Sequence, residues 1–167
     1  MPESSAVELV DVTDDAGTVI GVTTRREMRA RNLPHRCTYI LVFNRRGDLF
    51  VHQRTATKDV NPSFWDVAAG GVLSVGESFD ESARRELHEE LGVAAVPEPL
   101  FSFRYADERT TVHAMVYRVT HDGPFRFQPE EVAGGEFVPV AELERWFAVR
   151  QFCPDGVEVW RESVRRM

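Results

Sequence analysis

Three glutamates that could bind a metal ion, Glu86, Glu89 and Glu90, fall within five residues of one another. In an α-helix this i, i+3 and i+4 spacing brings the three carboxylates onto neighbouring faces. Like charges at this spacing repel by roughly a few tenths of a kcal/mol, so a purely structural surface would intersperse basic residues. Hard divalent cations bind clustered carboxylate oxygens, and Mg²⁺ also keeps water and phosphate ligands. The pattern therefore indicates a cation and phosphate site, and a solvated acidic surface helix is the alternative.

The sequence around these glutamates carries the signals of a helix with defined ends. Ser78 is suited to be the N-cap, and Glu81 three residues later completes a capping box. Helix-favouring residues follow up to Gly92, which is suited to end the helix. The apolar residues that recur every four positions are Ala83, Leu87 and Leu91. We therefore expect a helix with one buried apolar side and an acidic side next to it.

A glycine-rich loop precedes this helix. Gly70 and Gly71 allow the backbone to approach a ligand or metal closely, and Glu77 adds a further carboxylate. Gly71 is followed by five residues, Glu77, seven residues and then the run RELHEELGV at Arg85–Val93. This pattern of 23 residues resembles the complete Nudix box, and every fixed position of that box is filled.

The resemblance implies a pyrophosphohydrolase that depends on Mg²⁺ or Mn²⁺ and cleaves a nucleoside diphosphate linked to another group. The metal ligands that it implies are Glu86, Glu89, Glu90, Glu77 and the carbonyl group of Gly70. Glu89 and Glu90 match the principal ligands, and Glu86 matches a further ligand or the general base. Arg85 matches the arginine that orients the glutamates rather than touching the substrate. Bound metal ions would neutralise charge that develops on the pyrophosphate and make a bound water more nucleophilic.

Residues outside the box are further candidates for the site. Arg54 and Lys58 precede the glycine loop closely enough to reach its ligand, and their positive charges suit phosphate. Nudix enzymes often have another catalytic carboxylate in a later loop, and here Glu130 or Glu131 would serve. A short helix is expected between residues 24 and 31, where a basic solvated face is favoured over a phosphate site. Its arginines are Arg25, Arg26, Arg29 and Arg31.

The length of 167 residues predicts one domain, residues 1–167, with a substantial core. Apolar or alternating segments predict strands at 8–12, 18–22, 38–43, 49–54, 101–105 and 112–119. The first two would form an N-terminal hairpin over residues 8–22, and the Nudix box occupies residues 71–93. The resemblance implies an α+β fold: an α/β/α sandwich with a mixed central sheet, in which the box forms a loop–helix–loop.

The composition narrows the class of protein further. A net charge of −7 argues against a general nucleic-acid binder, although metal ions would still attract a small-molecule diphosphate. Cys37 and Cys153 are too few for a disulfide framework and lack a CxxC spacing, so we expect two reduced thiols. No signal peptide or membrane-spanning apolar run is evident, which predicts a cytoplasmic protein without a membrane partner. A homodimer is compatible with the sequence.

Several segments resemble the Nudix branch that contains isopentenyl-diphosphate isomerase and its bacterial relatives. These segments are residues 35–44, residues 51–54 and Trp65-Asp66. The isomerase needs a cysteine and a histidine in a Cys-Gly-His-Pro-like segment, where this chain has Ala69–Leu73 with neither residue. The sequence therefore favours a hydrolase on an isomerase-like scaffold. The alternatives are a non-catalytic Nudix module that binds a nucleotide or metabolite, and an isoprenoid diphosphate isomerase.

The other isomerase positions are also mostly unfilled in this chain. Of the N-terminal histidine ligands only His35 has a counterpart, and the expected acidic pair falls near Thr110 and Val112. Cys37 lies upstream of the position that the isomerase cysteine takes. A lone histidine at the start of a strand is more often structural than a metal ligand, and we interpret His35 in this way.

Overall fold

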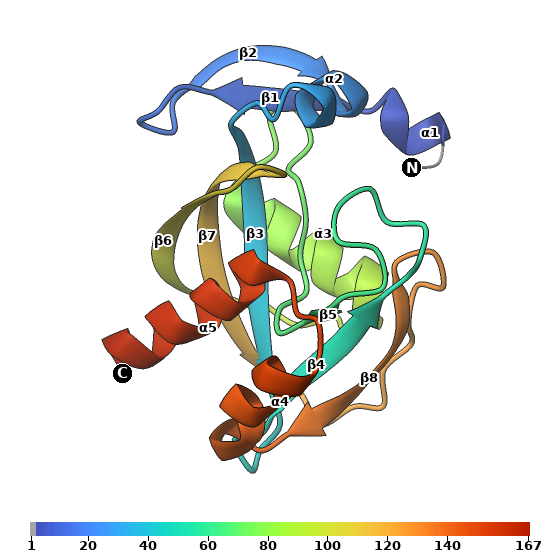
Figure 1. The fold of residues 1–167 in the computed structure, drawn as a ribbon, viewed down its shortest axis with the longest axis vertical. Coiled ribbons are helices and arrows are strands. Elements are labelled where there is room, and N and C mark those ends of the chain that lie inside the picture. The colour runs from blue at the N-terminus through green and yellow to red at the C-terminus, as the bar shows by residue number, and fades with distance from the viewer. Residues whose placement is uncertain (1–2) are drawn as a thin grey trace.

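The computed structural model describes residues 3–167 and shows a mixed eight-stranded sheet with helices on both faces (Figure 1). The strands are β1 (Leu9–Thr13), β2 (Val19–Thr24), β3 (His35–Phe43), β4 (Leu49–Arg54), β5 (Trp65–Asp66), β6 (Glu98–Ala106), β7 (Thr111–Thr120) and β8 (Val132–Val138). The helices are α1 (Glu3–Ala6), α2 (Arg25–Ala30), α3 (Phe79–Leu91), α4 (Leu143–Val149) and α5 (Pro154–Arg166), with a 3₁₀ turn at Val140–Glu142. Within residues 3–167, no helix has the length and apolar character needed to span a membrane.

Strand β3 is the centre of the sheet. Its residues 35–43 pair in parallel with residues 112–120 of β7, and it pairs in antiparallel fashion with β1 and β4. The other strands extend these pairs: β6 lies on β7, β5 and β8 lie on β4, and β2 lies on β1. The sheet is therefore mixed, as the sequence predicts.

Alternate residues of β3 point to opposite faces of the sheet, as the pleat requires. Tyr39 and Leu41 pack in one core cluster with Trp160 of α5, whereas Ile40 and Val42 pack in a second cluster. The second cluster contains the apolar stripe of α3, which consists of Ala83, Leu87 and Leu91. Figure 1 shows α4 and α5 on one side of the sheet and α3 on the other. The expected α/β/α sandwich is confirmed.

Helix α3 has the ends that its sequence predicts. The Ser78 side chain accepts a hydrogen bond from the Glu81 backbone, and the Glu81 side chain accepts one from the Ser78 backbone. Gly92 adopts the left-handed conformation (φ 70°) at the C-cap, where its N–H bonds the last carbonyl groups of the helix. Because both ends are closed locally, the position of each carboxylate along α3 is well defined.

The β1–β2 hairpin lies at one end of the molecule and leads directly into α2 (Figure 1). Its strands begin one residue later than the sequence suggests. Thr24 caps α2 by accepting a hydrogen bond from the Glu27 backbone at 3.2 Å. Thr24 and Glu27 have the spacing of a capping box, but only half of it forms, and the Glu27 carboxylate accepts a hydrogen bond from Arg31 instead.

Candidate metal and diphosphate site

The carboxylates of α3 line a depression of about 290 Å³ between the helix and the glycine loop. The acidic residues and loop residues that line it are Glu8, Gly70, Gly71, Glu86, Glu89, Glu90 and Glu131. Glu90 is buried, the Glu86 side chain is 12% exposed, and the Glu89 side chain is 46% exposed. The exposure of the three carboxylates that line the depression therefore increases from Glu90 through Glu86 to Glu89.

Arg85 holds the surrounding carboxylates together. Its Nε donates to Glu77 Oε1 at 2.7 Å and its Nη2 donates to Glu77 Oε2 at 3.0 Å. Its Nη1 donates to Glu86 at 3.0 Å and to Glu89 at 3.2 Å. Although burial opposes ionisation, the hydrogen bonds from Arg85 and the Ser74 backbone hold the pKa of Glu77 below its usual value. Glu77 does not line the depression and acts on it through Arg85.

The two most buried carboxylates of the helix are destabilised as anions. Burial, together with repulsion from Glu89, raises the pKa of Glu86 to about 7, although Arg85 partly opposes this shift. Burial and repulsion from Glu86 raise the pKa of Glu90 well above its usual value. Two neighbouring buried carboxylates of this kind favour a bound cation, because the cation offsets both the desolvation and the repulsion.

The glycine loop approaches this pair through its backbone. The Gly70 N–H donates to Glu90 Oε2 at 3.3 Å. Gly70 adopts φ +134°, and a Cβ at this position would lie 2.0 Å from the Thr38 carbonyl oxygen. Only glycine fits there, since both the conformation and the contact with β3 exclude a side chain.

The donor set fits a hard divalent cation. The lining supplies the carboxylates of Glu86, Glu89 and Glu90 and the backbone of Gly70, and carboxylate and carbonyl oxygens are the ligand types that Mg²⁺ and Mn²⁺ prefer. Among residues 3–167, no three Asp, Glu, His or Cys side chains already converge as a metal cluster. The carboxylates of Glu77, Glu86 and Glu89 are instead turned toward the Arg85 guanidinium. A cation bound by these residues would compete with Arg85 for the same oxygens.

The two loop glutamates proposed from the sequence are placed differently. Glu131 lines the depression and forms an ion pair with Lys58. Glu130 is exposed, and its backbone carbonyl accepts a hydrogen bond from the Thr55 hydroxyl at 2.8 Å. The sequence left open whether Glu130 or Glu131 is the additional carboxylate, and the geometry favours Glu131. Lys58 also lines the depression while it pairs with Glu131.

A second, more enclosed cavity of about 70 Å³ adjoins the depression. The residues that line both are Arg25, Lys58, Gly70, Gly71 and Val72. Arg25 and Arg29 enter this cavity from α2, and their Nε atoms donate to Asp59 Oδ2 at 3.1 Å and 3.0 Å. Their side chains are only 17% exposed, so the expected solvated face is wrong for these two arginines. Arg26 and Arg31, by contrast, are exposed as the sequence predicts.

The inner wall of the cavity is polar and charged. The Tyr39 hydroxyl donates to Asp155 at 2.7 Å, and Asp66 accepts hydrogen bonds from the Val67 and Ala68 backbones. Burial and the nearby Asp155 raise the pKa of Asp66 to about 7. Arg54 lies 3.9 Å from Asp66 and donates to the Val60 carbonyl, and its buried Nε has no hydrogen-bond partner within residues 3–167. The wall therefore combines carboxylates with a guanidinium.

The cavity also gathers the positions that correspond to the isomerase site. The sequence resemblance assigns to that site His35, the stretch Ala69–Val72, Thr110 and Val112, all of which line the cavity together with Cys37. The His35 ring bonds the Leu33 carbonyl at 2.9 Å, and burial with the nearby Arg29 lowers its pKa to about 3. Burial also raises the pKa of Cys37 to about 12. The lining holds no cysteine or histidine from the Ala69–Leu73 segment, so the two residues that the isomerase carries there are missing.

Three polar residues that line this cavity, Tyr39, Asp66 and Asp155, do not emerge from the sequence alone as site residues, and neither does Asp59, which pairs with Arg25. They come from different elements, and only the fold brings them together. One signal was available for the arginines of α2. Arg25 and Arg29 are four residues apart and therefore share a helix face, whereas Arg26 points elsewhere.

The sandwich, the glycine loop and the carboxylate-bearing helix together define a Nudix-type protein, and comparison with known proteins agrees. The NUDIX domain family matches residues 33–159. A Nudix hydrolase of Streptomyces coelicolor is 42% identical over 94% of this chain and 88% of its own length. Nudix hydrolase YfcD of Escherichia coli K12 is 40% identical over 97% of this chain and 89% of its own. The chain belongs to the Nudix hydrolase family.

Solved structures show the same fold. DR0079 from Deinococcus radiodurans matches with a TM-score of 0.81 and 28% identity over 93% of this chain and 98% of its own. The NUDIX domain of NrtR from Shewanella oneidensis, solved with ADP ribose, matches with a TM-score of 0.65 and 16% identity. That match covers 86% of this chain and 99% of the NrtR domain and supports the fold alone. Nudix hydrolases act on small nucleotide derivatives and generally use divalent metal ions.

Proposed function

We propose that this protein is a Mg²⁺- or Mn²⁺-dependent pyrophosphohydrolase that cleaves the diphosphate linkage of a nucleoside diphosphate derivative. One observation carries the proposal. The buried pair Glu86 and Glu90 faces a depression that opens into a polar cavity lined with arginines. Such a site suits an anionic diphosphate bound to metal on one side and its attached group on the other.

The proposed roles follow from what each side chain touches. Glu86, Glu89 and Glu90, with the Gly70 carbonyl, would hold the metal, which supplies charge neutralisation and a more acidic bound water. Arg85 positions Glu77, Glu86 and Glu89 through its hydrogen bonds. Either Glu86 or Glu131 accepts the proton of the attacking water, since both line the depression.

The cationic residues would bind the diphosphate. Lys58 and Arg25 line both the depression and the cavity, so they suit the bridge between the two phosphates. Arg54 lines the cavity and not the depression, so its guanidinium suits an oxygen of the attached group. ADP ribose, the ligand in the structure of the NrtR domain, is one nucleoside diphosphate derivative and is therefore included in the test panel.

The first test is a hydrolysis screen of the purified protein with Mg²⁺ and with Mn²⁺. The panel contains nucleotide sugars, ADP-ribose, NADH, coenzyme A, nucleoside triphosphates and isopentenyl diphosphate. Glu86→Gln and Glu90→Gln should each abolish turnover and leave the fold intact, as circular dichroism would show. Glu98→Gln, which changes an exposed carboxylate on β6, serves as the matched control and should retain full activity.

Direct metal binding separates the hydrolase from its alternatives. Titration with Mn²⁺ should show a site that weakens at least about tenfold in Glu90→Gln and not in Glu98→Gln. Metal-dependent cleavage lost in the variants supports the proposal. Metal or nucleotide binding without cleavage of any compound in the panel favours the non-catalytic module, and conversion of isopentenyl to dimethylallyl diphosphate favours the isomerase.

A further inference from the structure

Strand β2 forms an open edge of the sheet. Within residues 3–167 it pairs only with β1, and it is the end strand in the order β2-β1-β3-β4-β5. The hairpin stands at the end of the molecule, beyond the layers formed by α3, α4 and α5 (Figure 1). The outer edge of β2 therefore offers backbone N–H and C=O groups to another strand.

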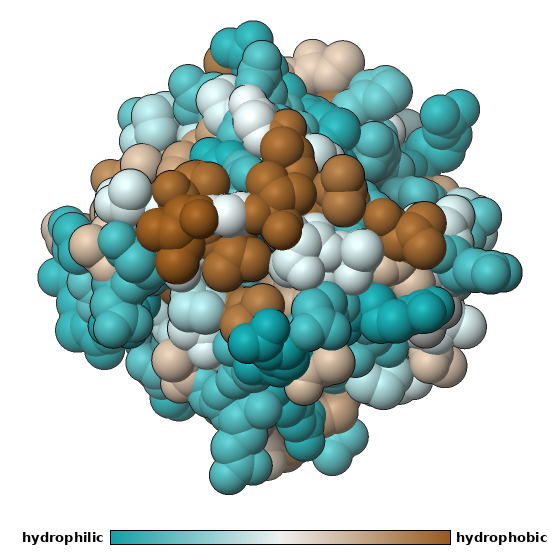
Figure 2. Space-filling model, turned by 90° about the horizontal axis from the view of Figure 1, so that it is seen from above, coloured by the Kyte–Doolittle hydropathy of each residue, from teal (hydrophilic) through white to brown (hydrophobic). Residues whose placement is uncertain are grey.

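This edge lacks the features that usually protect an edge strand. Its sequence, VIGVTT, contains no charged residue and no proline, although proteins commonly place lysine or proline on such strands. Val19, Ile20 and Val22 are 44%, 65% and 53% exposed, and Leu9 on the paired strand is 54% exposed. Figure 2 views this end of the molecule and shows hydrophobic surface running across it. An exposed apolar edge strand favours pairing with a further strand.

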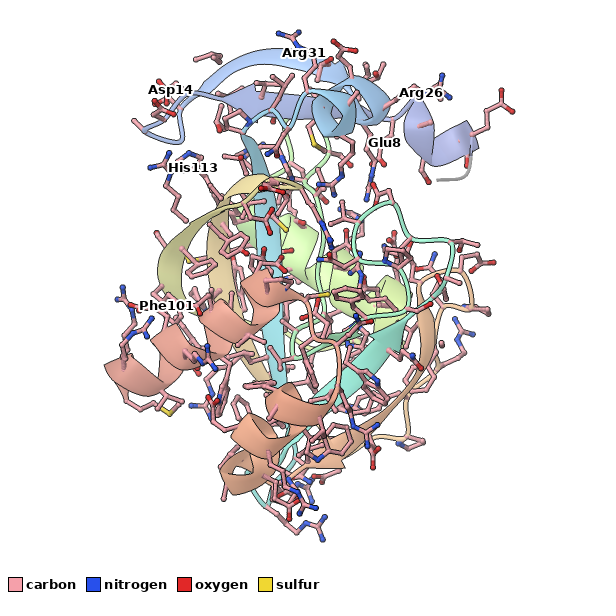
Figure 3. All side chains as sticks on the ribbon, in the orientation of Figure 1. Glu8, Asp14, Arg26, Arg31, Phe101 and His113 are labelled. Carbon is pink, nitrogen blue, oxygen red and sulfur yellow. The ribbon has the colours of Figure 1, made fainter. Side chains whose placement is uncertain are left out.

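The two ends of the hairpin carry opposite charges. Asp14 and Asp15 lie in the turn before β2, and the arginines of α2 follow β2 directly. In Figure 3, Asp14 lies at the turn end of the hairpin, whereas Arg26 lies at the opposite end. Asp15 and Arg26 are both exposed. An antiparallel strand with the same sequence would therefore bring each acidic turn beside the basic helix of the other copy.

We propose that β2 pairs antiparallel with β2 of a second copy of this chain and forms a symmetric dimer with one continuous sheet. A two-fold axis between the two β2 strands makes the surface self-complementary: apolar residues meet apolar residues, and each Asp15 faces the partner's Arg26. The pairing also abuts α2, whose Arg25 and Arg29 line the cavity. The proposal concerns a surface outside the metal site and does not depend on the proposed function.

The test is the mass of the full chain in solution, measured by sedimentation velocity from low to high micromolar concentration. We expect a species with twice the 19.0 kDa mass of the chain, in reversible equilibrium with the monomer. Val22→Lys should raise the dissociation constant at least tenfold, because it places two like charges across the two-fold axis. Val149→Lys changes a valine that is 72% exposed on α4 and should leave the dimer unchanged.

A charge exchange distinguishes the β2 pairing from any other dimer. Asp15→Arg and Arg26→Asp should each weaken the dimer, and the double variant should restore it, because the opposite charges meet again across the axis. Circular dichroism would establish that every variant folds. A wild-type protein that stays monomeric throughout the range would overturn the proposal. A dimer that resists Val22→Lys, or a double variant without rescue, would overturn it as well.

Discussion

Gly71 and Glu86 lie so close together that a Cβ added to Gly71 would sit 2.7 Å from Glu86 Oε1 and 3.0 Å from its carboxyl carbon. Gly71 does not adopt a left-handed φ, so its backbone conformation alone would accept a side chain. A side chain at this position would push the Glu86 carboxylate aside. The glycine loop therefore packs closely against α3 at Glu86, which the proposed mechanism uses as a metal ligand or general base.

Gly71→Ala should displace the Glu86 carboxylate and leave the fold in place. Displacements of about 1 Å at a catalytic group can lower the rate by about 100-fold, so we expect kcat/KM to fall by that order. Gly134→Ala is the matched control, because a Cβ at Gly134 meets nothing within 4 Å. Kinetics of both variants on one cleaved substrate would test the contact. Full activity in Gly71→Ala would show that the position of Glu86 is not critical.

The arginines of α2 divide into two that line the cavity and two that face solvent, which permits a matched comparison. Arg25→Met should raise KM about tenfold and change kcat little. The contact of Arg25 with the phosphate would bind the ground state and the transition state equally, so its loss weakens both alike. Arg31→Met removes the same charge from an arginine side chain that is 65% exposed and should leave both constants unchanged. Equal effects of the two substitutions would indicate only a loss of general positive charge.

Asp59 should stabilise the fold in a pH-dependent way. Burial alone would raise its pKa, but Arg29 and Arg25 lower the pKa well below its usual value. A carboxyl group with a depressed pKa in the folded state stabilises above its unfolded pKa, about 3.9, and loses this effect as the pH falls. Asp59→Asn should therefore lower the free energy of unfolding by about 2 kcal/mol at pH 7.

Urea unfolding at pH 7, 4 and 3 would measure this effect. The difference between the wild type and Asp59→Asn should begin to close below about pH 4. The control is Glu98→Gln, since Glu98 is an exposed carboxylate on β6. A constant difference across the pH range would contradict the assigned role of the charge on Asp59.

Local signals explain why α3 and its surroundings could be predicted from the sequence. A capping box, an apolar repeat and a terminal glycine act over three or four residues. The capping roles of Ser78, Glu81 and Gly92 can therefore be predicted without tertiary information. The apolar part of strand β3 could also be predicted, because a continuous apolar run is typical of a strand that is covered on both faces.

The cavity could not be predicted because its residues meet only through tertiary contacts. Tyr39 and Asp155 are 116 residues apart in the sequence, and Arg25 and Asp59 are 34 residues apart. The sequence of a short helix does not distinguish a buried arginine from a solvated one. The distinction depends on a distant partner, such as Asp59, which only the tertiary structure brings close. For this reason the sequence favoured a solvated face for Arg25, and the ion pair reversed that interpretation.

Cys37 should be chemically inert in the folded protein, although it lies in the cavity. Burial, with a contribution from Asp155, raises its pKa to about 12, so only about one molecule in ten thousand carries a thiolate at pH 8. Iodoacetamide should therefore label Cys37 at least about 100-fold more slowly than a cysteine introduced by Val96→Cys, where the valine is 70% exposed. Both native cysteines should label fully in urea. Rapid labelling of Cys37, detected by mass spectrometry, would show a reactive thiol in the cavity and would contradict the raised pKa.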